Sequence, residues 1–335
     1  MENPDSQRLV TKVARLYHTH GLRQKEIGDR LAISQSRVSR LLTQAEEAGI
    51  VRTVVAVPLH LHSDLEEAVE QQFDVDEVHV VESVGDTEAE LRQDLGVAAA
   101  SILSEVSLEA AAIGWSSWSR TLRATVDNLL PLRLGTRHVV EMLGDLGPPA
   151  LQHDAAGSTQ KLATLLDAEA VFLRTPGVVP TRAVADALLA QNTYARHALD
   201  LLDQLDIAFL SIGGCAIEEP LRLGHNMFSK RQIDGVRKAG AVGEVCLRYI
   251  DADGCPVASP LDELTIGVTL DQLLKARRRW AVVGGESKRE AIRAALRGRW
   301  VDVLVTDVGT ARWLAPEGPT APTKKRRSTD AKAAR

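Results

Sequence analysis

The sequence predicts an α/β protein of two domains: an N-terminal helix-turn-helix domain and a larger Rossmann-like α/β domain. Its first 50 residues contain three short segments with apolar residues at helical spacing. Residues 75–315 repeat an apolar strand, a small-residue turn and a helix, which is typical of a parallel sheet covered on both faces. The chain has 335 residues, enough for one small domain and one of roughly 250 residues. We therefore expect a helix-turn-helix domain over 1–58, an α/β domain over 59–316 and a disordered basic tail over 317–335.

The composition excludes a membrane protein and a secreted disulfide scaffold. No segment approaches the roughly 18 consecutive apolar residues of a membrane helix. The N-terminus lacks the basic start and apolar core of a signal peptide, so a cytoplasmic protein without a membrane partner is expected. The three cysteines, Cys215, Cys246 and Cys255, show no Cys-x-x-Cys spacing. They are expected to be buried thiols, and neither a metal nor a cofactor is expected.

Charge is distributed unevenly along the chain. Residues 1–58 carry a net charge of +3, residues 59–323 carry −13 and residues 324–335 carry +5. A positive first domain on an acidic body is what a protein needs when only that domain is to approach a polyanion.

The N-terminal segment predicts three short helices. The first covers about residues 6–20 and ends at Gly21; the second runs from about 24 to 31. The third starts after Ser34, a residue suited to capping a helix N-terminus, and runs to about residue 48. The β-branched segment 50–57 predicts a strand or small wing, and the linker between the domains is expected near residues 56–64.

The second and third helices fit a helix-turn-helix unit. Gly28 and Ala32 are small where two helices are expected to cross closely. The apolar contact between the helices is expected from Ile27, Leu31, Val38, Leu41 and Leu42.

The other face of the third helix carries the side chains that recognise DNA in such units. They are Gln35, Ser36, Arg37, Ser39, Arg40 and Gln44. Gln35, Ser36 and Arg37 at the helix start are the expected base readers, since Arg suits guanine and Gln suits adenine. Arg40 suits a base or a phosphate, and Gln24 a backbone phosphate. The alternative is a solvated surface helix; the coincidence of cap, small residues and polar face favours operator DNA as a partner.

The α/β domain is expected to bind its ligand at the carboxyl ends of parallel strands. The predicted strands are 77–81, 110–113, 139–143, 207–212, 280–283 and 301–305. The turn after the second of these is small and hydroxyl-rich and leads into a helix, which favours an anion such as phosphate. Its candidate ligand-binding residues are Gly114, Ser116, Ser117, Trp118, Ser119, Arg120 and Thr121. A purely structural turn is the alternative.

Two further residues are candidates for the ligand site. Lys288 follows Gly284-Gly285-Glu286-Ser287 and is expected in the first turn of a helix, where a positive charge is unfavourable unless a bound phosphate or sugar uses it. Asp251 lies in an acidic turn, 249–254, that lacks the spacing of a calcium loop. Its carboxylate is suited to accepting hydrogen bonds from sugar hydroxyls.

These motifs occur in an order that resembles the SorC family of sugar-binding transcriptional regulators, over about residues 7–315. The resemblance rests on the helix-turn-helix, on 113–122, on 206–214, on 241–254 and on 284–288 leading to Thr306-Asp307. It implies an effector domain of the sugar-phosphate isomerase type that binds a sugar or sugar phosphate and thereby changes operator affinity. It also implies a homo-oligomer, a dimer or tetramer. The chain departs from the family at Ser119, where glycine usually precedes the Arg-Thr pair; this leaves the phosphorylation of the effector open.

Two functions are compatible with these features. The first is a DNA-binding regulator of a carbohydrate operon whose operator affinity is set by the sugar. The second is a sugar-phosphate isomerase with an accessory DNA-binding domain, which requires a base next to the carbonyl. Asp251 and Glu286 are the only candidates for that base, so a regulator that is not an enzyme is the preferred interpretation.

Overall fold

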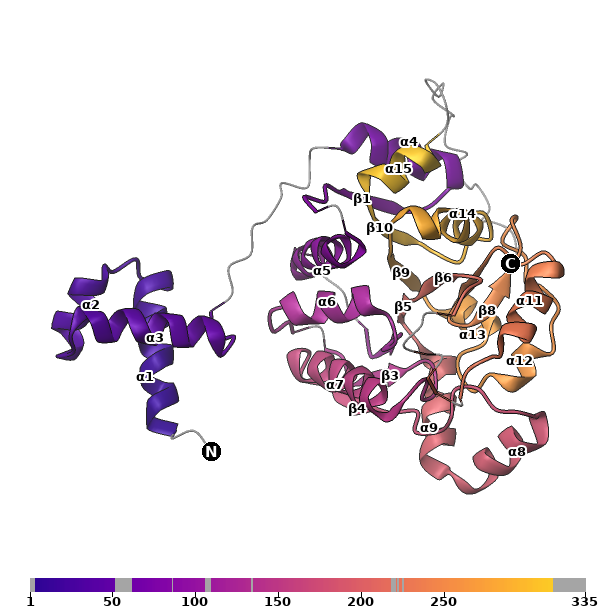
Figure 1. Cartoon of the computed structure of the whole chain (residues 1–335), viewed down its shortest axis with the longest axis horizontal. Helices are drawn as coiled ribbons and strands as arrows, with labels where there is room; N and C mark the ends of the chain where they lie inside the picture. The colour runs from indigo at the N-terminus through magenta and orange to yellow at the C-terminus, as the bar shows by residue number, and fades with distance from the viewer. Residues whose placement is uncertain are drawn as a thin grey trace, which may run out of the picture. The chain divides into compact units, whose positions relative to one another are not determined.

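The computed structural model describes residues 4–51, 62–85, 87–105, 110–133, 135–217, 221, 223–224 and 226–315 (Figure 1). The chain divides into two compact units, Met1–Val55 and Ala56–Arg335. The expected boundary at residue 58, most of the predicted strand 50–57 and the predicted tail 317–335 lie outside the described residues.

The N-terminal unit contains the three predicted helices. Helix α1 (Pro4–Ala14) continues into a π-helical turn, η1 (Arg15–Thr19), and is followed by α2 (Gln24–Leu31) and α3 (Gln35–Glu47). Helices this short need one another's apolar faces to be stable. Their shared core consists of Val10, Val13, Ala14, Leu16, Ile27, Val38, Leu41, Leu42 and Ala45, all buried.

Gly28 and Ala32 have different roles in the turn between α2 and α3. A Cβ at Gly28 would lie 2.8 Å from the carbonyl oxygen of Ile33, so only glycine fits against the turn. Ala32 is exposed and adopts a left-handed conformation with φ 53° at the end of α2. The expectation that Ala32 lies at a close helix crossing is therefore wrong: the residue ends the helix.

The second unit is built on a seven-stranded sheet in which all pairs are parallel. The strand order is β1 (Glu77–Val81), β10 (Val303–Asp307), β9 (Arg278–Val282), β5 (Ile207–Leu210), β2 (Ala112–Trp115), β3 (His138–Glu141) and β4 (Glu169–Val171). Each of the first six overlaps a strand predicted from the sequence, with ends that differ by up to two residues in all but β1, whereas β4 was not predicted. From β2 the chain adds β3 and β4 on one side and then returns to add β5, β9 and β10 on the other. The strand order therefore reverses between β2 and β5, the place where such sheets bind ligands.

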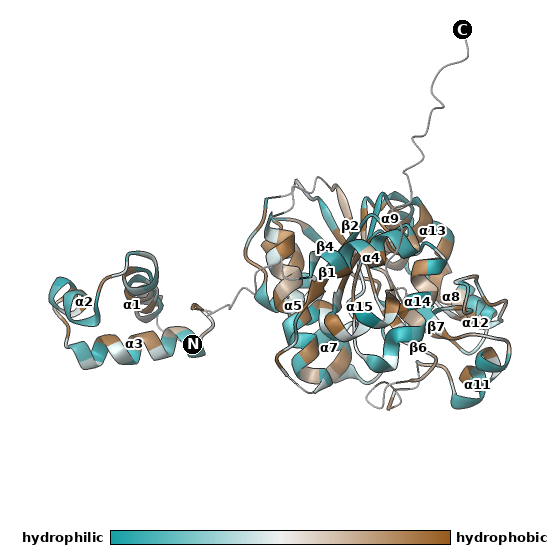
Figure 2. Cartoon of the chain, turned by 90° about the horizontal axis from the view of Figure 1, so that it is seen from above, coloured by the Kyte–Doolittle hydropathy of each residue, from teal (hydrophilic) through white to brown (hydrophobic). Residues whose placement is uncertain are grey.

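Helices cover both faces of this sheet, as expected from strands that are buried throughout. One face is covered by α5 (Glu88–Glu105), α6 (Arg120–Asn128) and α7 (Pro149–Leu165), which lie side by side in Figure 1. The apolar core of the other face includes residues of α4 (Ser63–Phe73), α8 (Arg182–Gln191), α9 (Thr193–Leu201), α11 (Lys230–Lys238), α12 (Leu261–Leu264), α13 (Leu270–Lys275), α14 (Arg289–Arg297) and α15 (Val308–Leu314). In Figure 2 hydrophobic colour concentrates on the strands inside this unit.

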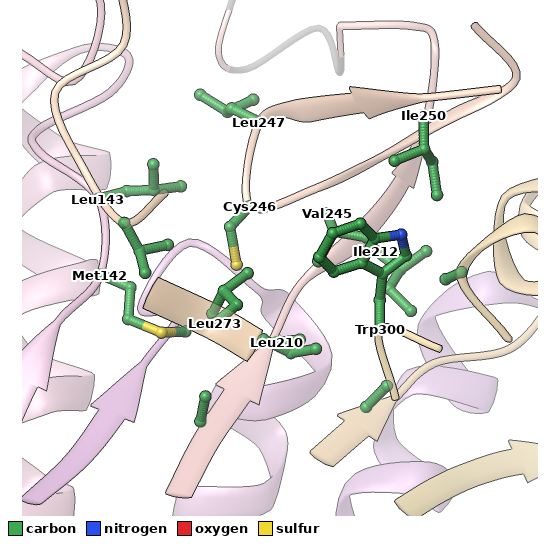
Figure 3. Packing of buried hydrophobic residues seen from close by; sticks show 14 of the residues in the cluster. Met142, Leu143, Leu210, Ile212, Val245, Cys246, Leu247, Ile250, Leu273 and Trp300 are labelled. Atoms are coloured by element: carbon green, nitrogen blue, oxygen red, sulfur yellow. The ribbon is translucent and has the colours of Figure 1, made fainter. Parts of the chain in front are cut away.

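A small antiparallel sheet, not predicted from the sequence, lies next to the main one. It consists of β6 (Ile212–Gly214), β7 (Gly243–Val245) and β8 (Arg248–Ile250). The predicted strand 207–212 is thus divided, because β5 ends at Leu210 and β6 begins two residues later. Figure 3 shows Ile212, Val245 and the Trp300 indole packed together, which fixes the small sheet against the rest of the domain.

The edge strand β1 is covered by helix α4. The amides of Val78 and Val80 donate to the carboxylates of Glu70 (2.9 Å) and Glu66 (2.8 Å), one helical turn apart. Burial raises the pKa of the Glu70 carboxyl. These bonds occupy two edge amides that would otherwise be available to another strand.

The cysteines differ in exposure, and all three are free. Cys246 is buried and Cys215 half-buried, and burial raises the pKa of both thiols to about 11. Cys255 is exposed, so the expectation of buried thiols is wrong for this residue.

Candidate functional site

Helix α3 presents a polar face that the core leaves uncovered. Gln35, Ser36, Arg37, Ser39 and Arg40 are exposed. Gln44, near the end of α3, and Gln24, the first residue of α2, are half-buried. Figure 2 shows hydrophilic and hydrophobic residues alternating along α3.

Hydrogen bonds order the start of α3. Ser34 caps the helix, its Oγ accepting from the Arg37 amide at 3.3 Å. The hydroxyls of Ser34 and Ser36 lie 3.0 Å apart, and Arg40 Nε donates to the Ser36 carbonyl at 3.4 Å. These bonds fix the backbone at Arg37. Among the described residues, no carboxylate pairs with the Arg37 guanidinium.

The α/β domain contains a cavity of about 440 Å³ at the reversal point between β2 and β5. Its walls come from the β2–α6 loop, the start of α5, the small antiparallel sheet and the loop before α14. Polar lining comes from Glu88, Arg92, Ser119, Arg120, Thr121, Ser211, Glu244, Tyr249, Ser287 and Lys288, and apolar lining includes Trp118, Leu143, Leu146, Ile212, Leu221, Met227 and Leu247.

The predicted turn 114–121 divides into a buried part and a part that lines the cavity. Gly114 lies within β2, where a Cβ would come within 2.7 Å of the Leu205 and Met142 side chains. Ser116 and Ser117 are buried below the cavity lining. Trp118, Ser119, Arg120 and Thr121 all face the cavity.

Trp118 and Ser119 are held by local hydrogen bonds. The Trp118 indole Nε1 donates to the Gly144 carbonyl at 3.1 Å, which fixes the ring at the cavity wall. Ser119 is the N-cap of α6, and its Oγ accepts from the Leu122 amide at 3.3 Å. The Ser119 hydroxyl thus occupies one of the free amides at this helix start.

The charged side chains that line the cavity are three cations, Arg92, Arg120 and Lys288, and two carboxylates, Glu88 and Glu244. Arg92 pairs with Glu88 at 3.3 Å, and Glu88 also accepts from the Ser287 hydroxyl at 3.1 Å. Glu244 accepts a hydrogen bond from the Leu247 amide.

Lys288 is the last residue of the short 3-10 turn η3 (Glu286–Lys288) and the N-cap residue of α14, rather than a residue of the helix's first turn as predicted. Among the described residues no carboxylate pairs with its ammonium group.

Asp251 does not line this cavity. Its carboxylate accepts from the backbone amides of Asp253 (3.0 Å) and Cys255 (2.9 Å), so it stabilises its own turn. Conversely, sequence reasoning missed Arg92, Glu244 and Tyr249. Arg92 lies in the middle of a helix with no adjacent turn motif, so nothing in its sequence context distinguishes it from a surface arginine.

No group of three or more His, Cys, Asp or Glu side chains in the described part of the chain is placed to hold a metal ion. No described helix is both long and apolar enough to cross a membrane.

Comparison with known proteins assigns both units. Residues 57–315 match the sequence profile of the family described as "Putative sugar-binding domain", and residues 7–47 match region 4 of sigma-70 factors. The chain is 29% identical over 317 residues to the sorbitol operon regulator of Klebsiella pneumoniae, covering 94% of this chain and 99% of the relative. It is 30% identical over 311 residues to the deoxyribonucleoside regulator of Bacillus subtilis, covering 92% and 98%.

Solved structures agree with these matches. The full-length sorbitol operon regulator SorC of Klebsiella pneumoniae superposes with a TM-score of 0.69 at 27% identity, covering 93% of this chain and 99% of that one. The sugar-binding domain of the regulator DeoR from Pseudomonas syringae pv. tomato gives 0.59 at 33% identity, covering 76% and 100%.

A helix-turn-helix unit and an α/β domain with a polar cavity, in one chain, define a ligand-binding transcriptional regulator. The profile match covers most of the chain, and the relatives align over nearly their whole length. The chain belongs to the SorC family of sugar-binding transcriptional regulators, as the sequence motifs predicted.

Proposed function

We propose that this protein regulates a carbohydrate uptake or catabolic operon by binding operator DNA through α3 and a sugar phosphate in the 440 Å³ cavity. The observation that carries the proposal is the convergence of Arg92, Arg120 and Lys288 on a cavity that also contains Trp118. A phosphate needs cationic donors, and a sugar ring offers C–H groups to an indole face.

Within the cavity, Lys288 and Arg120 are the proposed phosphate ligands, since they lie at the starts of α14 and α6 respectively. Ser119 and Thr121 supply further hydroxyl donors. Gly114, Ser116 and Ser117 support the loop from below. Asp251 has at most a structural part here, because backbone amides already occupy its carboxylate.

The proposed base readers on the DNA side are Gln35, Ser36 and Arg37. The proposed phosphate contacts are Arg40 and Gln24. Two further residues, Ser39 and Gln44, are proposed to contact DNA next to them. A ligand changes operator affinity only by the difference in its own affinity for the two states of the protein, typically about 1–3 kcal/mol. In this proposal the protein acts in the cytoplasm as a dimer or tetramer, because paired half-sites on an operator need paired recognition helices.

The domain is proposed to bind its sugar without turning it over. Glu88 and Glu244, the carboxylates that line the cavity, already accept hydrogen bonds from Arg92 and Ser287 and from the Leu247 amide. Incubation with ribose 5-phosphate and glucosamine 6-phosphate is expected to leave both unchanged. Turnover by the purified protein would contradict this part of the proposal.

The proposal is tested by capturing genomic fragments with the purified protein and titrating the captured operator. Arg37→Ala is expected to weaken operator binding by about 1–3 kcal/mol, whereas Thr43→Ala, an exposed residue on the same helix outside the predicted set, is expected to bind normally. A normal gel-shift titration for Arg37→Ala at fixed salt rejects its role as a base reader.

The effector half is tested by a thermal-shift screen of sugars and sugar phosphates, because a ligand that binds only the folded state raises the melting temperature. Lys288→Ala is expected to keep operator binding and lose the response to the effector found. Lys238→Ala, an exposed lysine on α11, is the matched control. A full response in Lys288→Ala removes that residue from the site.

A further inference from the structure

A second cavity, of about 740 Å³, lies at the carboxyl ends of β1 and β10. The motif 284–288 leading to Thr306-Asp307 contributes to its lining, but the proposed function assigns this cavity no ligand. Its lining consists of Glu82, Ser83, Gly85, Thr87, Glu88, Leu91, Gly285, Glu286, Ser287, Asp307, Val308, Gly309 and Arg312.

The two cavities share part of their lining. Glu88 and Ser287 line both of them, and the Ser287 hydroxyl donates a hydrogen bond to the Glu88 carboxylate at 3.1 Å. The Glu88 side chain is 65% exposed, although it also pairs with Arg92. An exposed ion pair such as Glu88–Arg92 contributes only about 0–1 kcal/mol. The Ser287–Glu88 hydrogen bond is also exposed, and a hydroxyl group of a ligand can replace it because it offers Glu88 the same kind of donor.

The chemistry of the second cavity differs from that of the first. Arg312 is its one cation, against the carboxylates of Glu82, Glu88, Glu286 and Asp307. Asp307 is already occupied by the Gly285 amide at 2.8 Å and by Thr310. In the described part of the chain, Glu82, Glu286 and Arg312 have no ion-pair or hydrogen-bond partner for their charged groups.

This lining disfavours a phosphate and favours a neutral polyol. Carboxylates accept hydrogen bonds from hydroxyl groups, a guanidinium donates to them, and excess negative charge repels an anion. Leu91 and Val308 add apolar surface against which the C–H face of a ring can lie. Each cavity lies within the size range of pockets that hold a small ligand alone, so the pair is larger than one sugar unit requires.

We infer that the effector has two sugar units: a disaccharide phosphate whose phosphorylated ring occupies the first cavity and whose neutral second ring occupies the second. This inference rests on the proposed function, since it assumes that the first cavity binds a sugar phosphate. In the complex the second ring accepts from Arg312 and donates to Glu82 or Glu286, and it separates Ser287 from Glu88.

The test compares matched ligands by calorimetry on the full-length protein. Glucose 6-phosphate is compared with trehalose 6-phosphate, sucrose 6-phosphate and cellobiose 6-phosphate. At least one disaccharide phosphate is expected to bind about tenfold more tightly than glucose 6-phosphate, because the second ring gains hydrogen bonds to charged groups. Arg312→Ala and Glu286→Gln are each expected to remove most of that gain and to leave glucose 6-phosphate affinity within about twofold.

Arg196→Ala, on the exposed surface of α9, is the control and is expected to change neither affinity. Lys288→Ala is expected to weaken monosaccharide and disaccharide phosphates alike. Equal affinities for the two ligand sizes, or a disaccharide gain that survives both Arg312→Ala and Glu286→Gln, overturns the second subsite but not the proposed function. If no sugar phosphate of either size binds, the proposed function fails and the second subsite fails with it.

Discussion

Glu141 offers a quantitative test of how the sheet is held together. It is the last residue of β3 and only 3% exposed. Its carboxyl accepts from the Thr159 hydroxyl (3.0 Å) and the Leu173 amide (3.0 Å), which ties β3 to α7 and to the segment after β4. Burial raises the pKa of Glu141 from 4.5 to about 7, against the opposing effects of Arg174 and these hydrogen bonds.

The sign of the pH effect follows from this raised pKa. Between pH 4.5 and pH 7 the folded protein holds a proton on Glu141 that the unfolded chain has released, so folding is progressively weakened as the pH rises. Below pH 4.5 both states are protonated and the penalty vanishes; above pH 7 both are ionised and it is constant. A difference of about 2.5 pKa units corresponds to a penalty on the order of 3 kcal/mol.

The substitution Glu141→Gln removes the ionisable group and keeps the shape of the side chain. The amide oxygen can accept from Leu173, and the amide nitrogen can donate to Thr159, whose hydroxyl then donates to the Ala155 carbonyl 3.3 Å away. The difference in free energy of unfolding between the variant and wild type is expected to grow by about 2–3 kcal/mol, in favour of the variant, as the pH rises from 5 to 8.

The free energy of unfolding is measured by urea denaturation, followed by tryptophan fluorescence. All five tryptophans lie between residues 115 and 313, so the signal reports on the α/β domain alone. Subtracting the variant from wild type at each pH cancels the titration of groups that do not interact with Glu141. A difference that stays flat from pH 5 to pH 8 refutes the assignment of a raised pKa to Glu141.

Two substitutions test the N-terminal unit. Ser34→Ala removes the cap of α3 and is expected to lower the free energy of unfolding of that unit by about 1 kcal/mol, measured by circular dichroism; an unchanged transition would show that the cap contributes nothing. Gly28→Val places side-chain atoms against the Ile33 carbonyl, 2.8 Å from the Cβ position, and is expected to abolish operator binding, whereas Asp29→Ala at the exposed neighbouring position is expected to bind normally. Operator binding retained by Gly28→Val would show that the turn can open without loss of function.

The sequence was most informative where local chemistry decides structure. Helices α2 and α3 begin and end close to the predicted residues. Their ends depend on local signals, such as the capping residue Ser34 and the spacing of apolar residues, and such signals can be recognised in the sequence. The six predicted strands exist because a strand buried on both faces must be apolar throughout. The convergence of Trp118–Thr121 with Lys288 followed from the rule that the carboxyl ends of parallel strands share one edge.

Other features depend on contacts between distant parts of the chain. The strands of the small sheet are only three residues long, and β6 and β7 contain glycines, so no periodicity marks them. The Asp251 carboxylate accepts from the backbone amides of its own turn rather than from a ligand, and this depends on how the turn places Asp253 and Cys255. Arg92 on α5 lines the same cavity as Arg120 and Thr121 on α6, and these two helices, separate in sequence, pack against each other.

In the proposed function, sugar bound in the α/β domain and DNA bound to α3 influence each other's binding. Thermodynamic linkage makes this influence reciprocal: the factor by which the effector changes operator affinity equals the factor by which the operator changes effector affinity. The decisive measurement is effector affinity by calorimetry with and without a saturating operator fragment, alongside operator affinity with and without effector. We expect two equal factors, each of about 5–150, and both reduced to one in Lys288→Ala. Effector affinity that is the same with and without the operator would show that the two sites are not coupled.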